Sequence, residues 1–460
     1  MKMRNNISLL LVTVAFATVM GSCGIYNKYS LPDEGITAEY NAALEQDVDS
    51  TALGNLSWTE IFTDPVLQSL INQALENNID LENAKLNVDI AQAQLLGAKL
   101  NYLPSVTLSP NGSGSKVGSS GMDWGYQFPL AVSWEVDIFG NITNAKRQAK
   151  ANLLQSEAYE QAVRSQIICG VANTYYALVS LQKQLALYNE TAGLWKESVE
   201  VMKQMKIAGR YTEVAVVQSE ANYFSILATI PTIELSIKDL NNTMSLLLNV
   251  APQEWEVDVE SEVTLPASIS EDGIPMSYLA VRPDVRAAEQ SFASAFYATN
   301  KARSAFYPNV TLTATGGYGT LIGSTIFDPA KWFLSLAGQL TAPLFSRGQN
   351  IATLKAAKAQ QEQALNDFQY TLLSASADVS YALMATTKYA EAIEQLEKQV
   401  DRLDKAVEYN QDLMTLSTTT YLEVLTAQQS LLSSQISLIS TELSANQAAI
   451  NLYQSVGGGR

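Results

Sequence analysis

The segment from residue 124 to residue 140, WGYQFPLAVSWEVDIFG, alternates between apolar and polar side chains. Every second position carries a large apolar residue, with aromatic residues near both ends, and the positions between them are small, polar or acidic. An alternation with a period of two residues predicts a β-strand with one apolar face and one polar face. The apolar set is Tyr126, Phe128, Leu130, Val132, Trp134, Val136 and Ile138.

Three more segments continue this pattern. Residues 309–318 and 332–344 alternate in the same manner. The shorter run SVTLS at 105–109 is a weaker strand that precedes the strand at 124–140. The Gly/Ser-rich residues 111–123 separate the first two segments and residues 319–331 separate the other two, so we expect two β-hairpins. On the last strand the apolar face begins with Trp332, Leu334 and Leu336.

Most of the remaining chain has the period of a helix. Between residues 365 and 414, apolar positions recur at alternating spacings of three and four residues, which is the repeat of a coiled-coil seam. This pattern predicts very long helices at about 142–208 and 348–415, each roughly 100 Å long at a rise of 1.5 Å per residue. Shorter helices at about 212–250 and 418–455 are expected to turn back against them.

The chain is internally duplicated. The segment NIDLENAK at 78–85 matches RPDVRAAE at 282–289, so that Asp80 falls on Asp284. The segment YTEVAVVQSE at 211–220 matches YLEVLTAQQS at 421–430, which places Glu213 on Glu423. Repeats of this length indicate one structural unit used twice. The predicted first repeat covers residues 61–250, with strands at 104–138 and long helices at 142–250. The predicted second repeat covers 277–456, with strands at 307–345 and long helices at 348–455. An acidic linker at 251–276 joins them, and a disordered tail follows at 457–460.

A lipid bilayer explains a strand with two such faces. Four strands cannot lie open in a bilayer, because their edge N–H and C=O groups would have no partners, and the smallest membrane barrels use about eight strands. The strands must therefore be pooled between copies. An eight-stranded barrel is filled by side chains, whereas the polar inner set (Gln127, Ser133, Glu135, Thr311, Thr313 and Gln339) suits a wet lumen, which favours twelve strands from three copies.

In this interpretation the apolar face of the strands contacts lipid. The alternative is the edge of a soluble β-sandwich packed on a core, but that arrangement would not need aromatic residues at both ends of the strand. The residues expected to face the membrane are Tyr126, Phe128, Leu130, Val132, Trp134, Trp332, Leu334 and Leu336.

The N-terminus has the features of an export signal. Lys2 and Arg4 precede a 14-residue apolar run at 7–20, which is short for a membrane span and typical of a signal peptide. Gly21 and Ser22 directly before Cys23 resemble the bacterial lipobox. We therefore expect removal of residues 1–22, covalent diacylglycerol and N-acyl chains on Cys23, and a lipid-anchored linker at 23–60; the alternative is an ordinary signal peptide with an incidental cysteine.

Composition argues against several classes of function. The net charge of −17 disfavours nucleic-acid binding, which requires Lys and Arg to displace counterions. The chain contains no histidine, which removes the common nucleophile–base systems and the commonest metal ligand. Glu135 and Asp137 lie on the same face of one predicted strand without an acid–base partner of another kind. We expect neither an enzyme, nor a cofactor, nor a bound metal.

Together these motifs resemble the TolC-like outer-membrane channels of tripartite efflux systems, and the lipobox points to their OprM-like, lipid-anchored branch. The resemblance rests on the duplicated order helix, strand, strand, helix, on RPDVRAAE, on YP before a Val-Thr-Leu strand, on PLFSRGQN and on YLEVLTAQQS, and it covers about 61–456. It implies an α+β membrane protein: a homotrimer with a twelve-stranded barrel in the outer membrane, continued by a helical tunnel across the periplasm. The implied partners are outer-membrane lipid, a periplasmic adaptor (membrane fusion protein) and an inner-membrane transporter of the RND type.

The same resemblance implies where a gate lies. In the family, acidic residues of the pattern YLDVLDAQ ring the closed periplasmic tip; here the pattern reads YLEVLTAQ, so Glu423 matches the first acid while Thr426 replaces the second. Three copies of Glu423 would attract cations at the narrowest point. Alternatively, these acids only stabilise the first turns of helices through the macrodipole. Further gate candidates are Glu213 and Asp412, and the candidates for a tip latch or adaptor contact are Arg210, Tyr211, Thr419 and Tyr421.

The leading interpretation is therefore a passive export duct. A duct for protein secretion fits the same pattern, because the inner-membrane partner selects the substrate. A lipid-anchored coiled-coil spacer or adhesin without a pore is the alternative from a different class.

Overall fold

The computed structural model describes residues 26, 28–44, 56–116, 118–119, 121–263, 276–321, 332–415 and 421–459. The chain forms two compact units, each built from three stretches of sequence. Unit 1 comprises Met1–Asp33, Leu86–Glu157 and Ala287–Tyr370, and unit 2 comprises Glu34–Lys85, Ala158–Arg286 and Thr371–Arg460. Cys23 and Thr419 lie outside the described residues.

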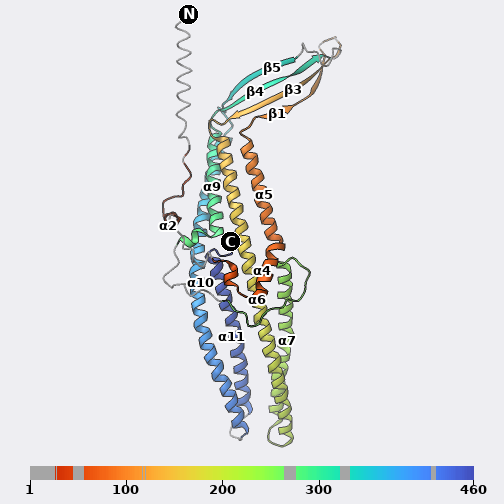
Figure 1. The fold of residues 1–460 in the computed structure, drawn as a ribbon, viewed down its shortest axis with the longest axis vertical. Coiled ribbons are helices and arrows are strands. Elements are labelled where there is room, and N and C mark those ends of the chain that lie inside the picture. Colours follow the sequence, from red (N-terminus) through yellow and green to blue (C-terminus); the bar gives the residue numbers. More distant parts are fainter. Residues whose placement is uncertain are drawn as a thin grey trace. The chain divides into compact units, whose positions relative to one another are not determined.

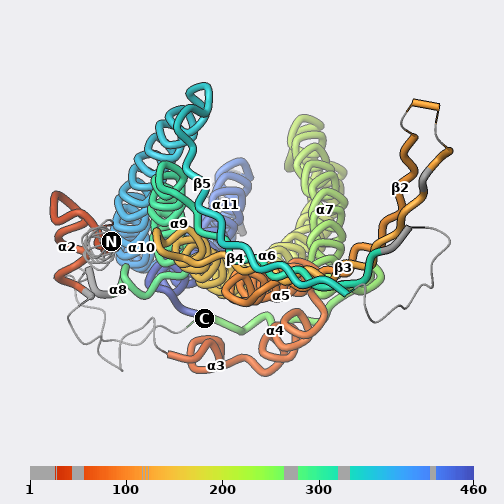
Figure 2. The backbone as a smooth tube through the Cα atoms, turned by 90° about the horizontal axis from the view of Figure 1, so that it is seen from above, coloured from red at the N-terminus to blue at the C-terminus, as the bar shows by residue number. Residues whose placement is uncertain are grey.

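Unit 1 contains one antiparallel sheet (Figures 1 and 2). The strands pair in the order β1-β3-β4-β5, and β2 pairs with β3 farther along the same edge. The two predicted hairpins are therefore joined through β3 and β4. The strands are β1 (Ser105–Leu108), β2 (Asn111–Ser115), β3 (Asp123–Val136), β4 (Asn309–Leu321) and β5 (Trp332–Thr341).

The register of the sheet separates its two faces as the alternation predicts. Val132 pairs with Ala314, which pairs with Leu336, so this row lies on the apolar face. The neighbouring row on the other face runs from Ser133 through Thr313. Because side chains alternate along every strand, the remaining rows follow the same assignment.

One loop prediction was wrong. Residues 111–115 are expected from the sequence to belong to the Gly/Ser-rich loop between two strands, but they form β2, which pairs with β3 from Asn111–Gln127 to Ser115–Asp123. The long apolar strand β3 offers a continuous row of backbone groups, and residues with small side chains can add to that row from the edge. The break between β1 and β2 lies opposite Pro129, which lacks an N–H and accepts a hydrogen bond from the Ser109 amide at 3.1 Å.

The helices repeat with equal lengths in the two halves. Each repeat contains a 22-residue, a 67-residue and a 35-residue helix, flanked by the shorter helices α2 (Ile36–Leu44), α3 (Trp58–Ile61), α4 (Pro65–Asn77) and α8 (Met276–Ala280). The pairs are α5 (Ile79–Leu100) with α9 (Pro283–Ser304), α6 (Asn141–Ile207) with α10 (Gln349–Thr415), and α7 (Glu213–Leu247) with α11 (Tyr421–Ser455).

These bounds correct the register that the tip motifs suggest. The offset is 204 residues from Ile79 to Pro283, and it is 208 residues both from Asn141 to Gln349 and from Leu247 to Ser455. The buried positions agree with 208, because Val216, Ser219 and Ile226 of α7 match the buried Val424, Ala427 and Ser434 of α11. Glu213 and Glu423 are therefore not equivalent positions, although their local motifs look alike.

Asp64 links three parts of unit 2. It caps the N-terminus of α4, where Pro65 occupies the first helical position, and accepts hydrogen bonds from the amides of Val66 and Leu67. It also accepts a short hydrogen bond from the hydroxyl of Tyr175 on α6, and this hydroxyl accepts one from the Asp258 amide at 2.8 Å. Burial opposes ionisation, but hydrogen bonds from Tyr175, Ser261 and the two amides outweigh it and lower the pKa of Asp64.

The three C-terminal glycines correct another prediction. They were expected to be disordered, but they are buried in unit 2, where Ser165 Oγ donates to the Gly458 carbonyl at 2.6 Å and the Gly459 amide donates to Tyr453 Oη at 2.9 Å. A Cβ at Gly458 would clash with the ring of Tyr453. A glycine run indicates a flexible backbone, yet contacts with Ser165 of α6 and with Tyr453 of the preceding helix α11 order it.

Replacing Asp64 with Asn should lower the free energy of unfolding at pH 7 by about 1–3 kcal/mol, because it removes a charged acceptor of several hydrogen bonds. Since the folded-state pKa of Asp64 is lowered, this stabilisation is present above the unfolded pKa of about 3.9 and is lost as the pH falls through the folded value. Circular dichroism during thermal unfolding at several pH values measures the difference. The exposed Asp239→Asn serves as the control, and a difference that does not shrink in acid would contradict the assignment.

Candidate functional site

The sheet of unit 1 has an apolar face that is uncovered in the described part of the chain. Phe128, Tyr318 and Trp332 lie in one row and form an aromatic band. Trp134 lies toward the other end of β3, and its indole N–H donates to the Tyr102 carbonyl at 3.0 Å. Tyr126 and Val132 are half-buried on this face, and the exposed members are Phe128, Leu130, Trp134, Trp332, Leu334 and Leu336.

A tight turn joins α6 to α7 at one end of unit 2. Gly209 has a φ of 70°, and the Arg210 amide donates to the Met205 carbonyl at 2.9 Å, which is a Schellman ending. Arg210 is exposed at this turn. The ring of Tyr211 stands edge-on to that of Tyr421, with centroids 6.2 Å apart. The structure thus brings two of the four latch candidates together.

The hydroxyl groups extend this contact between helices. Tyr421 Oη lies 2.7 Å from Ser198 Oγ on α6, and Tyr421 packs in a buried cluster with Trp195 and Met202. The start of α11 is therefore held against the end of α6 by one hydrogen bond and by apolar packing.

The candidate gate acids differ in their surroundings. Glu213 forms an ion pair with Lys206, and Glu220 forms one with Lys203 at 2.9 Å, so these two acids of α7 are paired with lysines of α6. Glu423 is exposed in the first turn of α11, and Asp412 is exposed near the end of α10. A role of Glu423 and Asp412 in gating stays a prediction.

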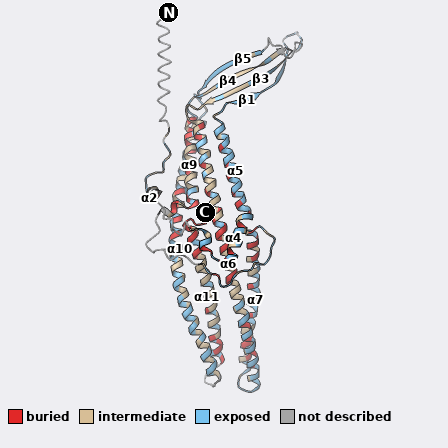
Figure 3. Ribbon diagram, viewed as in Figure 1, coloured by how far each residue is buried: buried red, intermediate tan, exposed pale blue. Residues whose placement is uncertain are grey.

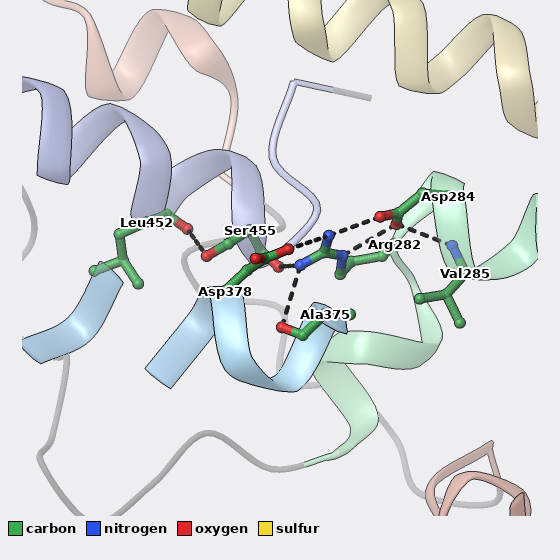
Figure 4. Close-up of polar contacts among 7 residues, drawn as sticks. All are labelled: Arg282, Asp284, Val285, Ala375, Asp378, Leu452 and Ser455. Carbon is green, nitrogen blue, oxygen red and sulfur yellow. Dashed lines mark hydrogen bonds and ion pairs between the residues drawn. The ribbon is translucent and has the colours of Figure 1, made fainter. Parts of the chain in front are cut away.

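Sequence reasoning did not assign a role to Arg282, which the structure buries between three helices (Figure 4). Its Nη1 donates to the carbonyls of Ser455 at 3.0 Å and Ala375 at 3.3 Å. Its Nε and Nη2 donate to the two oxygens of Asp284, and Asp378 lies 3.4 Å from Nη2. Burial disfavours the charge, but the two carboxylates outweigh it and raise the pKa of Arg282.

The first repeat makes the same connection with a neutral residue. Asn78 occupies the position equivalent to Arg282, and its side-chain amide donates to the Leu247 carbonyl at 2.8 Å. Leu247 ends α7 just as Ser455 ends α11. Both repeats therefore join the start of the 22-residue helix to the end of the 35-residue helix through one side chain. The sequence signal that points to this connection is the matched pair NIDLENAK and RPDVRAAE, in which Asn78 falls on Arg282.

The described residues offer little for catalysis or metal binding. No group of three or more His, Cys, Asp or Glu side chains among them could hold a metal ion. Cys169 is buried, and burial raises the pKa of its thiol to about 12. None of the described helices has a stretch long and apolar enough to cross a membrane.

A duplicated chain with an uncovered apolar sheet face and long helices in both repeats defines a subunit of a membrane channel wall. The model of the family described as outer membrane efflux protein matches residues 70–250 and 274–458. The chain belongs to this family, so it is an outer-membrane efflux channel and not an enzyme. Channels of this family form trimers in tripartite pumps, and the predicted TolC-like fold is confirmed.

Several known proteins are similar along nearly the whole chain. The toluene efflux pump outer membrane protein TtgC of Pseudomonas putida is 29% identical, covering 98% of this chain and 96% of the relative. The probable outer membrane lipoprotein SilC of Salmonella typhimurium is 25% identical, covering 98% and 99%. The open state of the MtrE channel of Neisseria gonorrhoeae matches with a TM-score of 0.81 and 25% identity, covering 95% of this chain and 98% of that chain.

Replacing Arg282 with Met should lower the free energy of unfolding by about 1–3 kcal/mol, because two carbonyl groups lose a buried donor. Thermal unfolding followed by circular dichroism measures the loss. Arg286→Met, on an exposed position of the helix α9 that follows Arg282, is the matched control and should have little effect. Equal stability of the two variants would show that the buried contacts of Arg282 contribute nothing.

Proposed function

We propose that three copies of this chain form a passive duct across the outer membrane and periplasm, which is gated at the turn between the long and short helices. The observation that carries this proposal is the two-faced sheet of unit 1. Its apolar rows suit lipid and its Ser/Thr/Gln rows suit water. The sheet is four strands wide, because β1 and β2 both pair with the same edge of β3, and four strands are too few to close a barrel. Three copies give a barrel that is twelve strands around, which leaves room for a lumen filled with water.

We propose a periplasmic adaptor and an inner-membrane transporter of the RND type as partners. A passive duct supplies no energy of its own, so transport against a gradient needs an energised partner. The similar proteins support this assignment, because several of them are named as parts of efflux pumps, among them a toluene pump in Pseudomonas putida and a cation efflux system in Escherichia coli. Exposed Arg210 and the neighbouring turn are the proposed adaptor contact.

A lipid anchor on Cys23 completes the proposal. Tyr26 lies three residues after this cysteine, so at about 3.5 Å per residue the anchor is within roughly 10 Å of Tyr26. The hydroxyl of Tyr26 donates to the Phe139 carbonyl at 2.7 Å, just after β3 ends at Val136. Tyr29 packs in the same unit against the rings of Phe292 and Phe296. These contacts support an anchor held beside the ends of the barrel strands, where a membrane surface is expected.

The gate charge is assigned to Glu423. Glu423 matches the first acid of the pattern YLDVLDAQ, and its side chain is exposed in the first turn of α11. A ring of three Glu423 carboxylates would favour cations at the tip.

Glu423→Gln should lower the cation-to-anion permeability ratio about two- to fivefold, the effect of about 0.4–1 kcal/mol per ion. Reversal potentials across planar bilayers under a salt gradient measure this ratio. Glu213→Gln, in the first turn of α7, is the matched control and should change the ratio less, because its position is not equivalent to that of Glu423. If the two variants behave alike, the gate charge is not at Glu423, and if the wild type shows no conductance steps, the pore itself is excluded in favour of a spacer.

Arg210→Ser should increase the passage of large solutes, because the turn would lose a cationic side chain that can bond across neighbouring helices. Uptake of a large antibiotic by intact cells measures this leak. Lys196→Ser, at an exposed position on α6, controls for loss of positive charge. Unchanged permeability of the Arg210 variant would count against a latch at this position.

A further inference from the structure

A cavity of about 430 Å³ lies in unit 2 between helices of both repeats. One wall belongs to α6 of the first repeat, and the other walls belong to α10 and α11 of the second repeat. Every residue that lines it is part of unit 2, so the cavity is formed within one chain. The proposed gate residue Glu423 is not among the lining residues.

The lining formed by α6 and α11 is largely apolar and closely packed. Trp195, Met202 and Val424 are 3%, 1% and 2% exposed. Tyr421 also lines the cavity, and its hydroxyl lies 2.7 Å from Ser198 Oγ. A lining of this kind favours a ligand with an aromatic or aliphatic body.

The lining formed by α10 is packed less closely. Val407 and Met414 line the cavity but are only half-buried. From residue 383 to residue 414, no described side chain of α10 is buried, and Figure 3 shows this part of the helix as exposed or intermediate. Space for a ligand therefore remains between α6 and α10, beside the closely packed contact of α6 with α11.

Acidic side chains line the cavity where it meets solvent. Glu190 and Glu197 of α6 and Asp404 of α10 are lining residues, and all three are exposed. Glu190 and Glu197 are seven residues apart on one face of α6, with exposed Leu194 between them. The described residues that line the cavity include no Lys or Arg, so its electrostatic potential favours a cation.

A buried acceptor indicates what kind of cation fits. Gln428 of α11 lines the cavity, and its Oε1 is buried without a hydrogen-bond partner among the described residues. An amide oxygen buried in this way is unfavourable, so an N–H group of a ligand would be bound with a gain in free energy. A quaternary ammonium has no N–H to donate, whereas a guanidinium or amidinium group presents several in one plane.

We infer that this cavity binds an aromatic cation with planar N–H donors, of the class of the aryl amidines. The aromatic body packs against the apolar side chains of α6 and α11, and an amidinium N–H donates to Gln428 Oε1. The carboxylates of α6 and α10 attract the positive charge. A bound ligand thus connects the first helical hairpin to the second. The inference goes beyond the proposed duct, because the site is formed within one chain whether or not copies assemble.

The test titrates the full-length protein, purified in a non-ionic detergent and treated with nuclease, with DAPI, a fluorescent phenylindole that carries two amidinium groups. The parent phenylindole has the same rings without the charges and serves as the neutral probe. Detergent micelles without protein give the background for both. DAPI should bind at least about tenfold more tightly than the neutral probe, because only DAPI satisfies the carboxylates and the buried acceptor.

Two variants separate the contributions of charge and hydrogen bonding. Glu197→Gln combined with Asp404→Asn should weaken DAPI binding about tenfold, because two of the three carboxylates are lost. Gln428→Leu should weaken it about three- to tenfold, because the buried acceptor is lost with little change of volume. Glu234→Gln, an exposed position of α7 that does not line the cavity, is the matched control and should bind like the wild type. Circular dichroism verifies that each variant is folded.

Each result decides the inference. Selective binding of DAPI that both variants weaken supports it. It is overturned if the wild type binds the two probes equally, or if the folded carboxylate variant binds DAPI as the wild type does. Weaker binding by the carboxylate variant together with unchanged binding by Gln428→Leu would exclude recognition of the N–H group and overturn it as well. Selective binding by a monomeric protein without conductance would support this inference while overturning the proposed duct.

Discussion

The constraint on which the structure depends is that backbone N–H and C=O groups in hydrocarbon must all find partners within protein. Within the sheet of unit 1, neighbouring strands satisfy these groups for one another. The backbone groups along its two edges, formed by β1 with β2 and by β5, have no neighbouring strand in the sheet. The apolar rows cannot be hidden within the chain either, because the described residues leave Trp332, Leu334 and Leu336 uncovered. Assembly of several copies meets both requirements together, since shared edges close the wall and lipid covers the apolar rows.

Duplication provides the wall with repeated solutions to the same packing problem. Asn78 and Arg282 occupy equivalent positions and reach equivalent carbonyls, of Leu247 and Ser455, although one side chain is neutral and the other is charged. Arg282 needs the carboxylates of Asp284 and Asp378 as partners, which a buried charge requires and an amide does not. The two repeats have thus kept the geometry of this connection while its chemistry diverged.

The two repeats differ in the contacts that they make near the turns between their long and short helices. Ion pairs connect Lys203 and Lys206 of α6 to acids of α7 in the first hairpin, whereas Tyr421 connects the start of α11 in the second hairpin to α6. Exposed ion pairs contribute little to stability, so the apolar cluster around Trp195 carries most of the energy that holds these helices. Charge at the tip is therefore available to influence ions without being needed for packing.

The sequence alone determined the periodic features: the two-faced strands, the long helices, the duplication and, through its motifs, the family. Periodicity reveals these because burial of one face imposes a repeat of two residues on a strand and of about 3.6 on a helix. Tertiary structure alone decided that residues 111–115 form a strand, that the C-terminal glycines are ordered, and that Glu213 is not the counterpart of Glu423. Each of these depends on packing or pairing in three dimensions, namely on β3, on Ser165 with Tyr453, and on the buried face of α7. The hydrophobic pattern of the segment itself does not record such contacts.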